Sequence, residues 1–244
     1  MNHHLYLLLA ALLVSSVSES AARTIRFRTV CFEFAPGERE VTASGDPKLK
    51  NTATVVLGRR LDSTQHEIEV AATTVVLGKL VLNADQQPSI EPMAVANLPD
   101  KGRHFLFLLL PSGRQSGEVY RCLVLEDGTD DFPAGGFRWV NLSPRKLRFA
   151  IGAESFVLPP GAIEMRKQIR GTGPGGRVPY VAQCQGGEVW NRLSSGFWTC
   201  HQHTRSLQVA FLDPRSGRVR MRGYDDTLPV ALEQRAREAA ADRN

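Results

Sequence analysis

Residues 104–114 read HFLFLLLPSGR, and residues 206–218 read SLQVAFLDPRSGR. Each stretch begins with an apolar run of strand length and ends in a turn that contains Pro, Ser and Gly. A second strand follows each turn and stops at acidic residues and a proline, Pro133 in one case and Pro229 in the other. This shared order predicts one β-hairpin used twice, and therefore an internal duplication. The alternative is two unrelated hairpins, because any tight turn favours Gly.

Strand signals continue along the rest of the chain, where short runs of β-branched and aromatic residues alternate with Gly, Pro, Asp and Ser. The expected strands are residues 24–34, 52–57, 69–82, 104–110, 119–125, 137–141, 147–151, 178–182, 207–212 and 219–224. Only residues 229–241 read as helical, because nearly all of them are strong helix formers. We therefore expect an all-β fold of two related β-sandwich-like domains with a short C-terminal helix.

The duplication also predicts domain boundaries. The chain is long enough for one large β domain or for two small ones that each bury a core. The repeated hairpin favours two domains, with a boundary close to Pro133. We expect a first β domain over residues 23–133, a second over 134–228, and a C-terminal helix or tail over 229–244.

Residues 1–22 have the anatomy of a secretory signal peptide, with an apolar run over residues 5–14 and small residues before a cleavage position after Ala22. The apolar run is too short to span a bilayer, and no later stretch reaches the length of a membrane helix. The region before the run lacks Lys and Arg, which is unusual for such a signal. We expect an exported protein, in the periplasm, at the cell surface or outside the cell, with no integral membrane segment after cleavage.

The charge balance limits the classes of partner. Removing residues 1–22 removes one acidic residue, Glu19, which leaves 30 Lys and Arg against 24 Asp and Glu and a net charge of +6. This mild excess suits weak attraction to an anionic envelope polymer or a polysaccharide, and another envelope protein is an alternative partner. Nucleic acid is not expected as a partner of an exported chain.

The four cysteines are Cys31, Cys122, Cys184 and Cys200, an even number in a chain predicted to leave the cytoplasm. Four cysteines allow three pairings. If the chain divides into halves, the economical pairing joins Cys31 to Cys122 and Cys184 to Cys200. The alternative is that some of them are buried thiols.

Two sets of residues are candidates for ligand binding. Trp190 and Trp198 flank a hairpin-like segment and could stack on sugar rings, although sandwich cores also need aromatic side chains. Arg218, Arg220 and Arg222 alternate along one strand and leave by one face, while the residues between them face the core. Such a stripe could bind an acidic polymer, or it could protect an exposed edge strand from aggregation.

The sequence gives little evidence of a metal site or a catalytic site. Cys200, His201 and His203 lack the fourth ligand of a structural zinc site, and on a strand they would point to opposite faces. The acidic run over residues 126–131 lacks the spacing of a dedicated calcium loop. The chain has no nucleophile elbow of the type Gly-x-Ser-x-Gly. We expect no cofactor, no metal and no catalytic residue.

The second half also carries Pro-Ala-Gly at residues 133–135, Asn-Leu-Ser at 141–143 and Leu-Pro-Pro-Gly at 158–161. This pattern resembles an uncharacterised family of exported bacterial β-sandwich proteins, mainly over residues 131–165. The resemblance implies a β-sandwich and an envelope setting, and it carries no catalytic residues.

Together these features predict a non-catalytic structural or interaction protein of the envelope or the extracellular space. One alternative is a carbohydrate-binding β-sandwich that uses Trp190 or Trp198 with the arginine stripe. A second alternative is an enzyme whose active site is assembled from residues far apart in the chain. The sequence leaves open the ligand, the oligomeric state and the disulfide connectivity.

Overall fold

The computed structural model describes residues 22–35, 39–61, 64–112, 119–201, 203–213 and 215–227. Almost all of the predicted signal peptide and the whole predicted C-terminal helix lie outside these residues. In the described part of the chain no helix is long and apolar enough to cross a membrane.

Sixteen strands and one short 3₁₀ helix make up the described structure. The first unit contains β1 (Arg23–Cys31), β2 (Glu40–Ser44), β3 (Thr52–Val56), β4 (His66–Val70), β5 (Thr74–Leu82), β6 (Pro88–Asn97), β7 (His104–Pro111) and β8 (Tyr120–Glu126). The second unit contains β9 (Phe137–Asn141), β10 (Leu147–Ile151), β11 (Glu154–Leu158), β12 (Ile163–Arg166), η1 (Pro174–Gly176), β13 (Arg177–Gly186), β14 (Val189–Thr199), β15 (Thr204–Leu212) and β16 (Val219–Thr227).

The two units have the same topology. The sheets of the first unit have the orders β4-β1-β7-β8 and β3-β2-β5-β6. Those of the second unit have the orders β12-β9-β15-β16 and β11-β10-β13-β14, so each strand number is larger by eight. In both units the first strand pairs in parallel with the seventh, and the seventh pairs with the eighth as a hairpin. The prediction of an all-β fold with two related sandwiches is confirmed, and the predicted boundary lies between β8 and β9.

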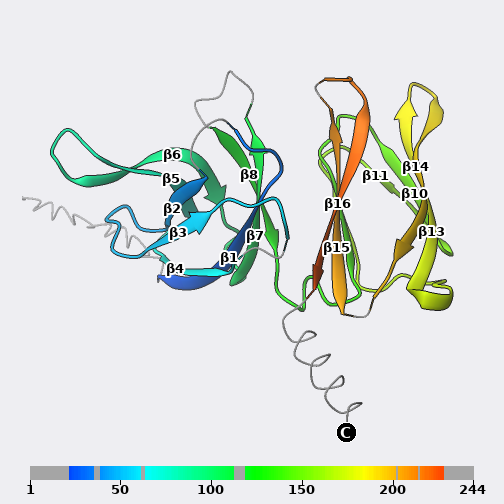
Figure 1. Ribbon diagram of the computed structural model, residues 1–244, viewed down its shortest axis with the longest axis horizontal. Helices are drawn as coiled ribbons and strands as arrows, with labels where there is room; N and C mark the ends of the chain where they lie inside the picture. Colours follow the sequence, from blue (N-terminus) through cyan, green and yellow to red (C-terminus); the bar gives the residue numbers. More distant parts are fainter. Residues whose placement is uncertain are drawn as a thin grey trace, which may run out of the picture.

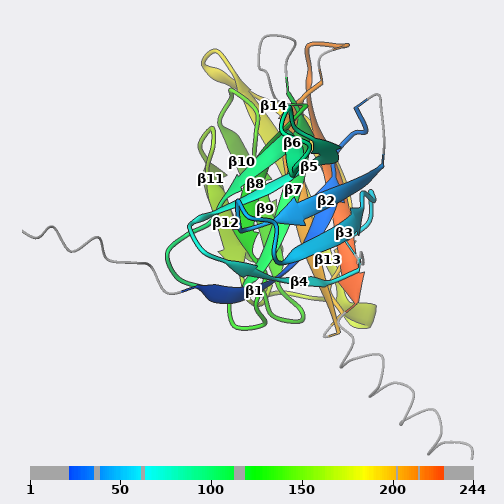
Figure 2. The same ribbon diagram turned by 90° about the vertical axis from the view of Figure 1, so that its left-hand side faces the viewer.

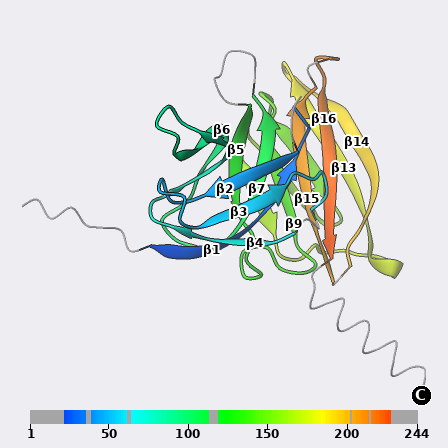
Figure 3. The same ribbon diagram turned by 60° about the vertical axis from the view of Figure 1, so that its left-hand side comes forward.

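The four sheets lie side by side as four layers (Figure 1). Seen from the side of the first unit, the strands of that unit lie in front of those of the second (Figure 2). Each sandwich has its own core, built around Phe27 and Phe107 in the first unit and around Trp139 and Phe149 in the second. The intermediate view in Figure 3 shows β5 and β6 extending away from the second unit as a long hairpin.

The two inner sheets, β4-β1-β7-β8 and β12-β9-β15-β16, pack against each other through a third apolar cluster. It includes Leu106 and Leu108 from β7 and Leu207 and Val209 from β15, all of them buried. Because alternate residues of a strand point to opposite faces, β7 also carries apolar residues, Phe105 and Phe107, on the side that faces the first sandwich. This explains why residues 104–110 read as a continuous apolar run.

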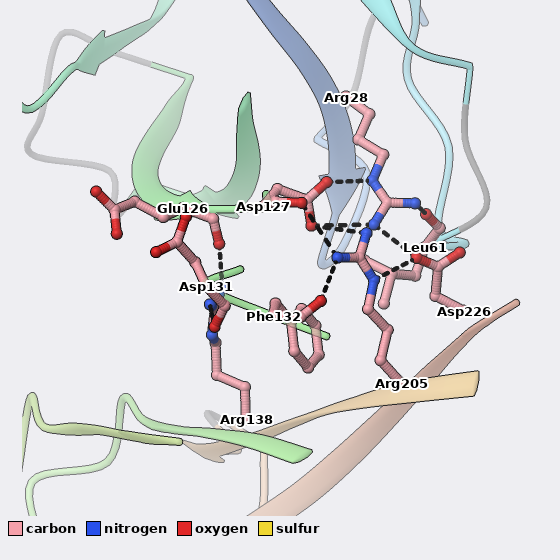
Figure 4. Close-up of polar contacts among 9 residues, drawn as sticks. All are labelled: Arg28, Leu61, Glu126, Asp127, Asp131, Phe132, Arg138, Arg205 and Asp226. Carbon is pink, nitrogen blue, oxygen red and sulfur yellow. Dashed lines mark hydrogen bonds and ion pairs between the residues drawn. The ribbon is translucent and has the colours of Figure 1, made fainter. Parts of the chain in front are cut away.

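A buried network of four charged side chains also joins the two units (Figure 4). Arg28 contacts Asp127 and Asp226 at 2.7 Å each, and Arg205 contacts the same two carboxylates at 3.1 and 2.9 Å. All four side chains are at most 10% exposed. Burial alone lowers the pKa of Arg28, but hydrogen bonds to the two carboxylates outweigh it and raise the pKa above its ordinary value.

The predicted disulfide between Cys31 and Cys122 is wrong, because the four cysteines form no disulfide with one another. Cys31 lies opposite Leu109 of β7, and Leu109 lies opposite Cys122 of β8. Two strand spacings therefore separate the cysteines, about 10 Å between Cα atoms. A disulfide requires Cα atoms within about 7 Å of each other.

The predicted disulfide between Cys184 and Cys200 is wrong for a related reason. Cys184 lies opposite Asn191, close to the turn of the β13–β14 hairpin. Cys200 follows β14 at the other end of this hairpin, where its amide donates to the carbonyl of Gly176. About 25 Å of strand separates the two ends. Cys31 and Cys184 are buried, as the alternative of buried thiols predicted for some of the four.

Candidate ligand-binding groove

The strands β14 and β16 form the open edge of the second sandwich. Each is the last strand of its sheet. Residues of both strands line one cavity, so the two lie on the same side of the sandwich. In the first unit the equivalent edge strands, β6 and β8, contact each other. No comparable contact joins β14 and β16. The second sandwich is therefore open along this edge.

The opening contains a groove of about 600 Å³ that continues into a second cavity of about 440 Å³. Ser194 and Met221 line both cavities. The larger cavity is lined mainly by aromatic and polar side chains: Phe137, Tyr180, Phe197, Trp198, Thr199, His201, Thr204, Ser206, Gln208, Gly223 and Asp225. The smaller cavity is lined by Leu193, Ser216, Arg218, Val219 and Arg220. We call the two cavities together the edge groove.

The parallel strand pairs show which residues of the two units correspond. In the first unit Arg28 of β1 lies opposite Leu106 of β7. In the second unit Arg138 of β9 lies opposite Leu207 of β15. Leu106 and Leu207 both belong to the cluster between the units, so they occupy equivalent positions. The residues next to them point into the two sandwiches, because side chains alternate along a strand.

These inward positions are aromatic in β7 and polar in β15. Phe105 and Phe107 fill the interior of the first unit and are at most 1% exposed. Their equivalents are Ser206 and Gln208, which are 5% and 7% exposed and line the edge groove. A hydroxyl and an amide therefore replace two rings at the base of the open edge.

A chain of hydrogen bonds orients these polar groups. Gln208 Nε2 donates to Ser206 Oγ at 2.8 Å, and Ser206 Oγ donates to Asp225 Oδ1 at 2.7 Å. Gly223 lies opposite Gln208 on β16, and a Cβ atom there would come within 2.9 Å of Gln208 Nε2. Glycine thus leaves room for the amide. Among the described residues, Gln208 Oε1 and Asp225 Oδ2 accept no further hydrogen bond, so they are available to a ligand.

The other wall of the edge groove is aromatic. Trp198 stacks on Tyr180 with ring centroids 3.8 Å apart and an interplanar angle of 5°. Trp198 also contacts Phe137 at 5.7 Å, which anchors it to the core. The hydroxyl of Tyr180 forms a 2.9 Å hydrogen bond with Ser194 Oγ. The structure therefore places Trp198 at the groove, partly packed against the core rather than fully exposed.

Trp190 lies elsewhere. It is opposite Gln185, on the outer face of the sheet, and the guanidinium of Arg148 lies 4.7 Å from its ring centroid. Trp198 points inward, because its partner Val178 is fully buried. The two tryptophans are thus on opposite faces of β14 and do not form one aromatic platform.

Of the predicted arginine stripe, Arg220 and Arg222 leave β16 by one face, whereas Arg218 precedes this strand, and the three have different surroundings. Arg222 contacts the first unit, where its guanidinium donates to the backbone carbonyl of Phe32 and lies 4.2 Å from the centroid of the Phe32 ring. Arg220 forms a 3.2 Å ion pair with Asp213. Arg218 lines the smaller cavity of the edge groove. The stripe is therefore not one continuous binding surface.

The described residues contain no group of three or more His, Cys, Asp or Glu that could hold a metal ion. Burial raises the pKa of Cys200 to about 11, so its thiol is protonated near neutral pH. A thiolate ligand or nucleophile is thus disfavoured at this position.

Sequence reasoning missed the polar base of the groove, which consists of Ser206, Gln208, Gly223 and Asp225. Each of these residue types is common in strands or turns, so none of them alone indicates a binding site. A usable signal was present in the duplication, since the second copy carries Ser and Gln where the first copy carries Phe.

Comparison with protein-family models gives no match to this chain, and comparison with curated proteins gives none either. The resemblance to a family of exported bacterial β-sandwich proteins therefore stays a prediction.

Proposed function

We propose that this protein is a non-catalytic binding protein of the cell envelope or the extracellular space, and that its edge groove binds a saccharide. One observation carries the proposal: the hydrogen-bonded groups of Gln208 and Asp225 face the same cavity as the stacked rings of Tyr180 and Trp198. A sugar presents both hydroxyl groups and apolar ring faces. Recognition sites for such ligands combine aromatic surface with a few placed polar groups.

The chemistry of the groove supports binding rather than hydrolysis. Its described lining contains one carboxylate, Asp225, whereas most glycoside hydrolases use two. The hydroxyl of Ser206 donates to that carboxylate rather than to His201, the one histidine of the described lining, so Ser206 lacks the histidine base that activates a serine nucleophile. The exported setting rests on residues 1–22, and the net charge of the mature chain suits an anionic environment.

The test is calorimetric titration of the protein with neutral gluco-, manno-, xylo- and N-acetylglucosamine oligosaccharides. We expect saturable binding of at least one series. Asp225→Asn keeps the shape of the side chain but removes its charge, which should weaken binding by about tenfold or more, since hydrogen bonds to charged groups contribute about 1.5–3 kcal/mol.

Glu126 is the matched control, because it occupies in β8 the position that Asp225 occupies in β16. Glu126→Gln should leave binding unchanged. Absence of binding to every series, or equal weakening by both variants, would contradict the proposal. Shortened saccharides in the reaction mixture would instead identify an enzyme with a dispersed active site.

A further inference from the structure

The outer face of the sheet β11-β10-β13-β14 forms the outermost layer of the second unit (Figure 1). Arg148 of β10 lies opposite Gln183 of β13, and Gln183 lies opposite Arg192 of β14. Arg177 belongs to the same strand as Gln183 and is an even number of residues away, so it points to the same side. The three arginines therefore share this face, because the neighbouring Ala182 is fully buried on the other.

Two of these guanidinium groups lie over aromatic rings. Arg148 is 4.7 Å from the ring centroid of Trp190, and Arg177 is 4.5 Å from that of Phe197. Arg148 also donates through Nε to Gln183 at 2.8 Å. Stacking fixes the plane of a guanidinium and leaves N–H groups along its edge for bidentate contacts with a carboxylate. We call Arg148, Arg177, Arg192, Trp190 and Phe197 the arginine face.

The arginine face contains no acidic residue. The outward positions of its four strands are Ser155, Val157, Arg148, Ala150, Arg177, Pro179, Val181, Gln183, Gln185, Trp190, Arg192, Ser195, Phe197 and Thr199. Among the described residues, none of its three arginines forms an ion pair, whereas Arg28 and Arg205 each contact two carboxylates. Phe197 is also 59% exposed. Positive charge and aromatic surface thus remain uncovered on one flat face.

We propose that the arginine face binds an acidic polysaccharide. Two strand spacings place Arg148 about 10 Å from Arg192, and Arg177 lies about 20 Å further along the sheet. One small anion cannot bridge these distances, but a polymer with repeated carboxylates can contact all three arginines, which multiplies the individual weak contacts. The exposed rings add apolar surface suited to sugar rings. Of these five residues only Phe197 lines the edge groove, so the proposal stands apart from saccharide binding there.

The experiment measures binding of fluorescent polygalacturonate to the full mature chain at low and high salt. The test variant is the triple substitution Arg148→Gln, Arg177→Gln and Arg192→Gln. Its matched control is Lys48→Gln, Lys101→Gln and Arg103→Gln, three exposed residues of the first unit whose loss changes the net charge equally. Circular dichroism and thermal unfolding verify that both variants are folded. Neutral dextran, monomeric galacturonate and vesicles with anionic phospholipid are the comparison ligands.

We expect salt-sensitive binding of polygalacturonate that falls about tenfold or more in the test variant and at most about twofold in the control. Monomeric galacturonate and dextran should bind far more weakly. Gln208→Phe, which fills the groove, should leave this binding intact and so separates it from groove binding. The proposal is overturned if polygalacturonate does not bind, if both triple variants lose equal affinity, if the monomer binds as tightly as the polymer, or if only the vesicles bind.

Discussion

The first and second units share a strand order but differ at one edge. In the first unit Phe105 and Phe107 fill the interior, and β6 contacts β8. In the second unit Ser206 and Gln208 occupy the equivalent positions and the edge is open. The comparison shows that topology alone does not create the groove. A few side chains on one face of β15 and β16 decide whether the sandwich closes or presents polar groups to a ligand.

The largest expected effect comes from truncating the equivalent inward residues. Phe107→Ala should lower the free energy of unfolding by about 3–5 kcal/mol, because it removes a fully buried ring and leaves a cavity. Gln208→Ala should cost about 1 kcal/mol, since it removes one neutral hydrogen bond and the space that it leaves joins the edge groove. Urea unfolding of both variants measures the difference. Equal losses would show that Gln208 is a structural residue and would remove the contrast between the units.

A second prediction asks how strongly the two units depend on each other. Asp226→Ala should lower the free energy of unfolding by about 3–5 kcal/mol, because it leaves Arg28 and Arg205 buried with one carboxylate fewer. Glu67→Ala is the control at an exposed pair, where Glu67 is 54% exposed and its partner Arg26 is 55% exposed, and it should cost less than about 1 kcal/mol. Chemical unfolding followed by fluorescence measures both. A small effect of Asp226→Ala would mean that the buried charge network contributes little to the stability of the two units.

A third prediction concerns a substitution that makes the open edge of the second unit more like the closed edge of the first. Gln208→Phe places in the second unit the ring that Phe107 places in the first. We expect saccharide binding in the groove to fall by about tenfold or more, because the ring displaces the hydrogen-bonding amide and fills the cavity. The free energy of unfolding should fall by no more than about 3 kcal/mol. Titration calorimetry and urea unfolding of one preparation check both parts. Undiminished binding would place the saccharide site outside the groove.

The smallest expected effect concerns alkaline pH and the second unit. Burial raises the pKa of Cys200 from 9.0 to about 11. Below pH 9 the thiol is protonated in the folded and unfolded states, so its contribution to stability is complete. As the pH rises from 9 to 11 the unfolded thiol ionises first, and this contribution is lost. Because Cys200 is partly exposed, we expect a loss of about 1 kcal/mol.

Urea unfolding of wild type and Cys200→Ser at pH 8 and pH 10.5 measures this effect. The difference in stability between the two proteins should narrow at the higher pH. A difference that is independent of pH would show that Cys200 titrates in the folded protein as it does in the unfolded chain.

The sequence predicted the fold well where the pattern was local. Residues 137–141, 147–151 and 207–212 were expected as strands and fall within β9, β10 and β15. The expected strand over residues 69–82 is wrong, because Ala71, Ala72 and Thr73 separate β4 from β5. These residues carry no Gly or Pro, so composition gave no signal for the break.

The site was harder to predict because it depends on pairing between distant strands. The disulfide predictions failed since connectivity is set by register, which spacing along the chain does not reveal. Arg28 meets Asp226 across 198 residues, and no local pattern indicates that contact. Trp198 was chosen because it flanks a hairpin-like segment, and Arg218 because the arginines alternate along a strand. The structure places both at the edge groove, whereas Trp190 lies on the other face of β14. Ser206 and Gln208 of β15 stand out as candidate ligand contacts only when they are compared with Phe105 and Phe107, the equivalent residues of β7.

The parallel pairing of the first strand with the seventh has a kinetic consequence. β1 can pair with β4 earlier, but its parallel pair forms only when the chain as far as β7 is available, and β9 likewise waits for β15. Folds dominated by such distant pairings form slowly, on the order of milliseconds to seconds. During synthesis each sandwich therefore stays incomplete until its seventh strand has been made, which leaves time for a chaperone to bind it.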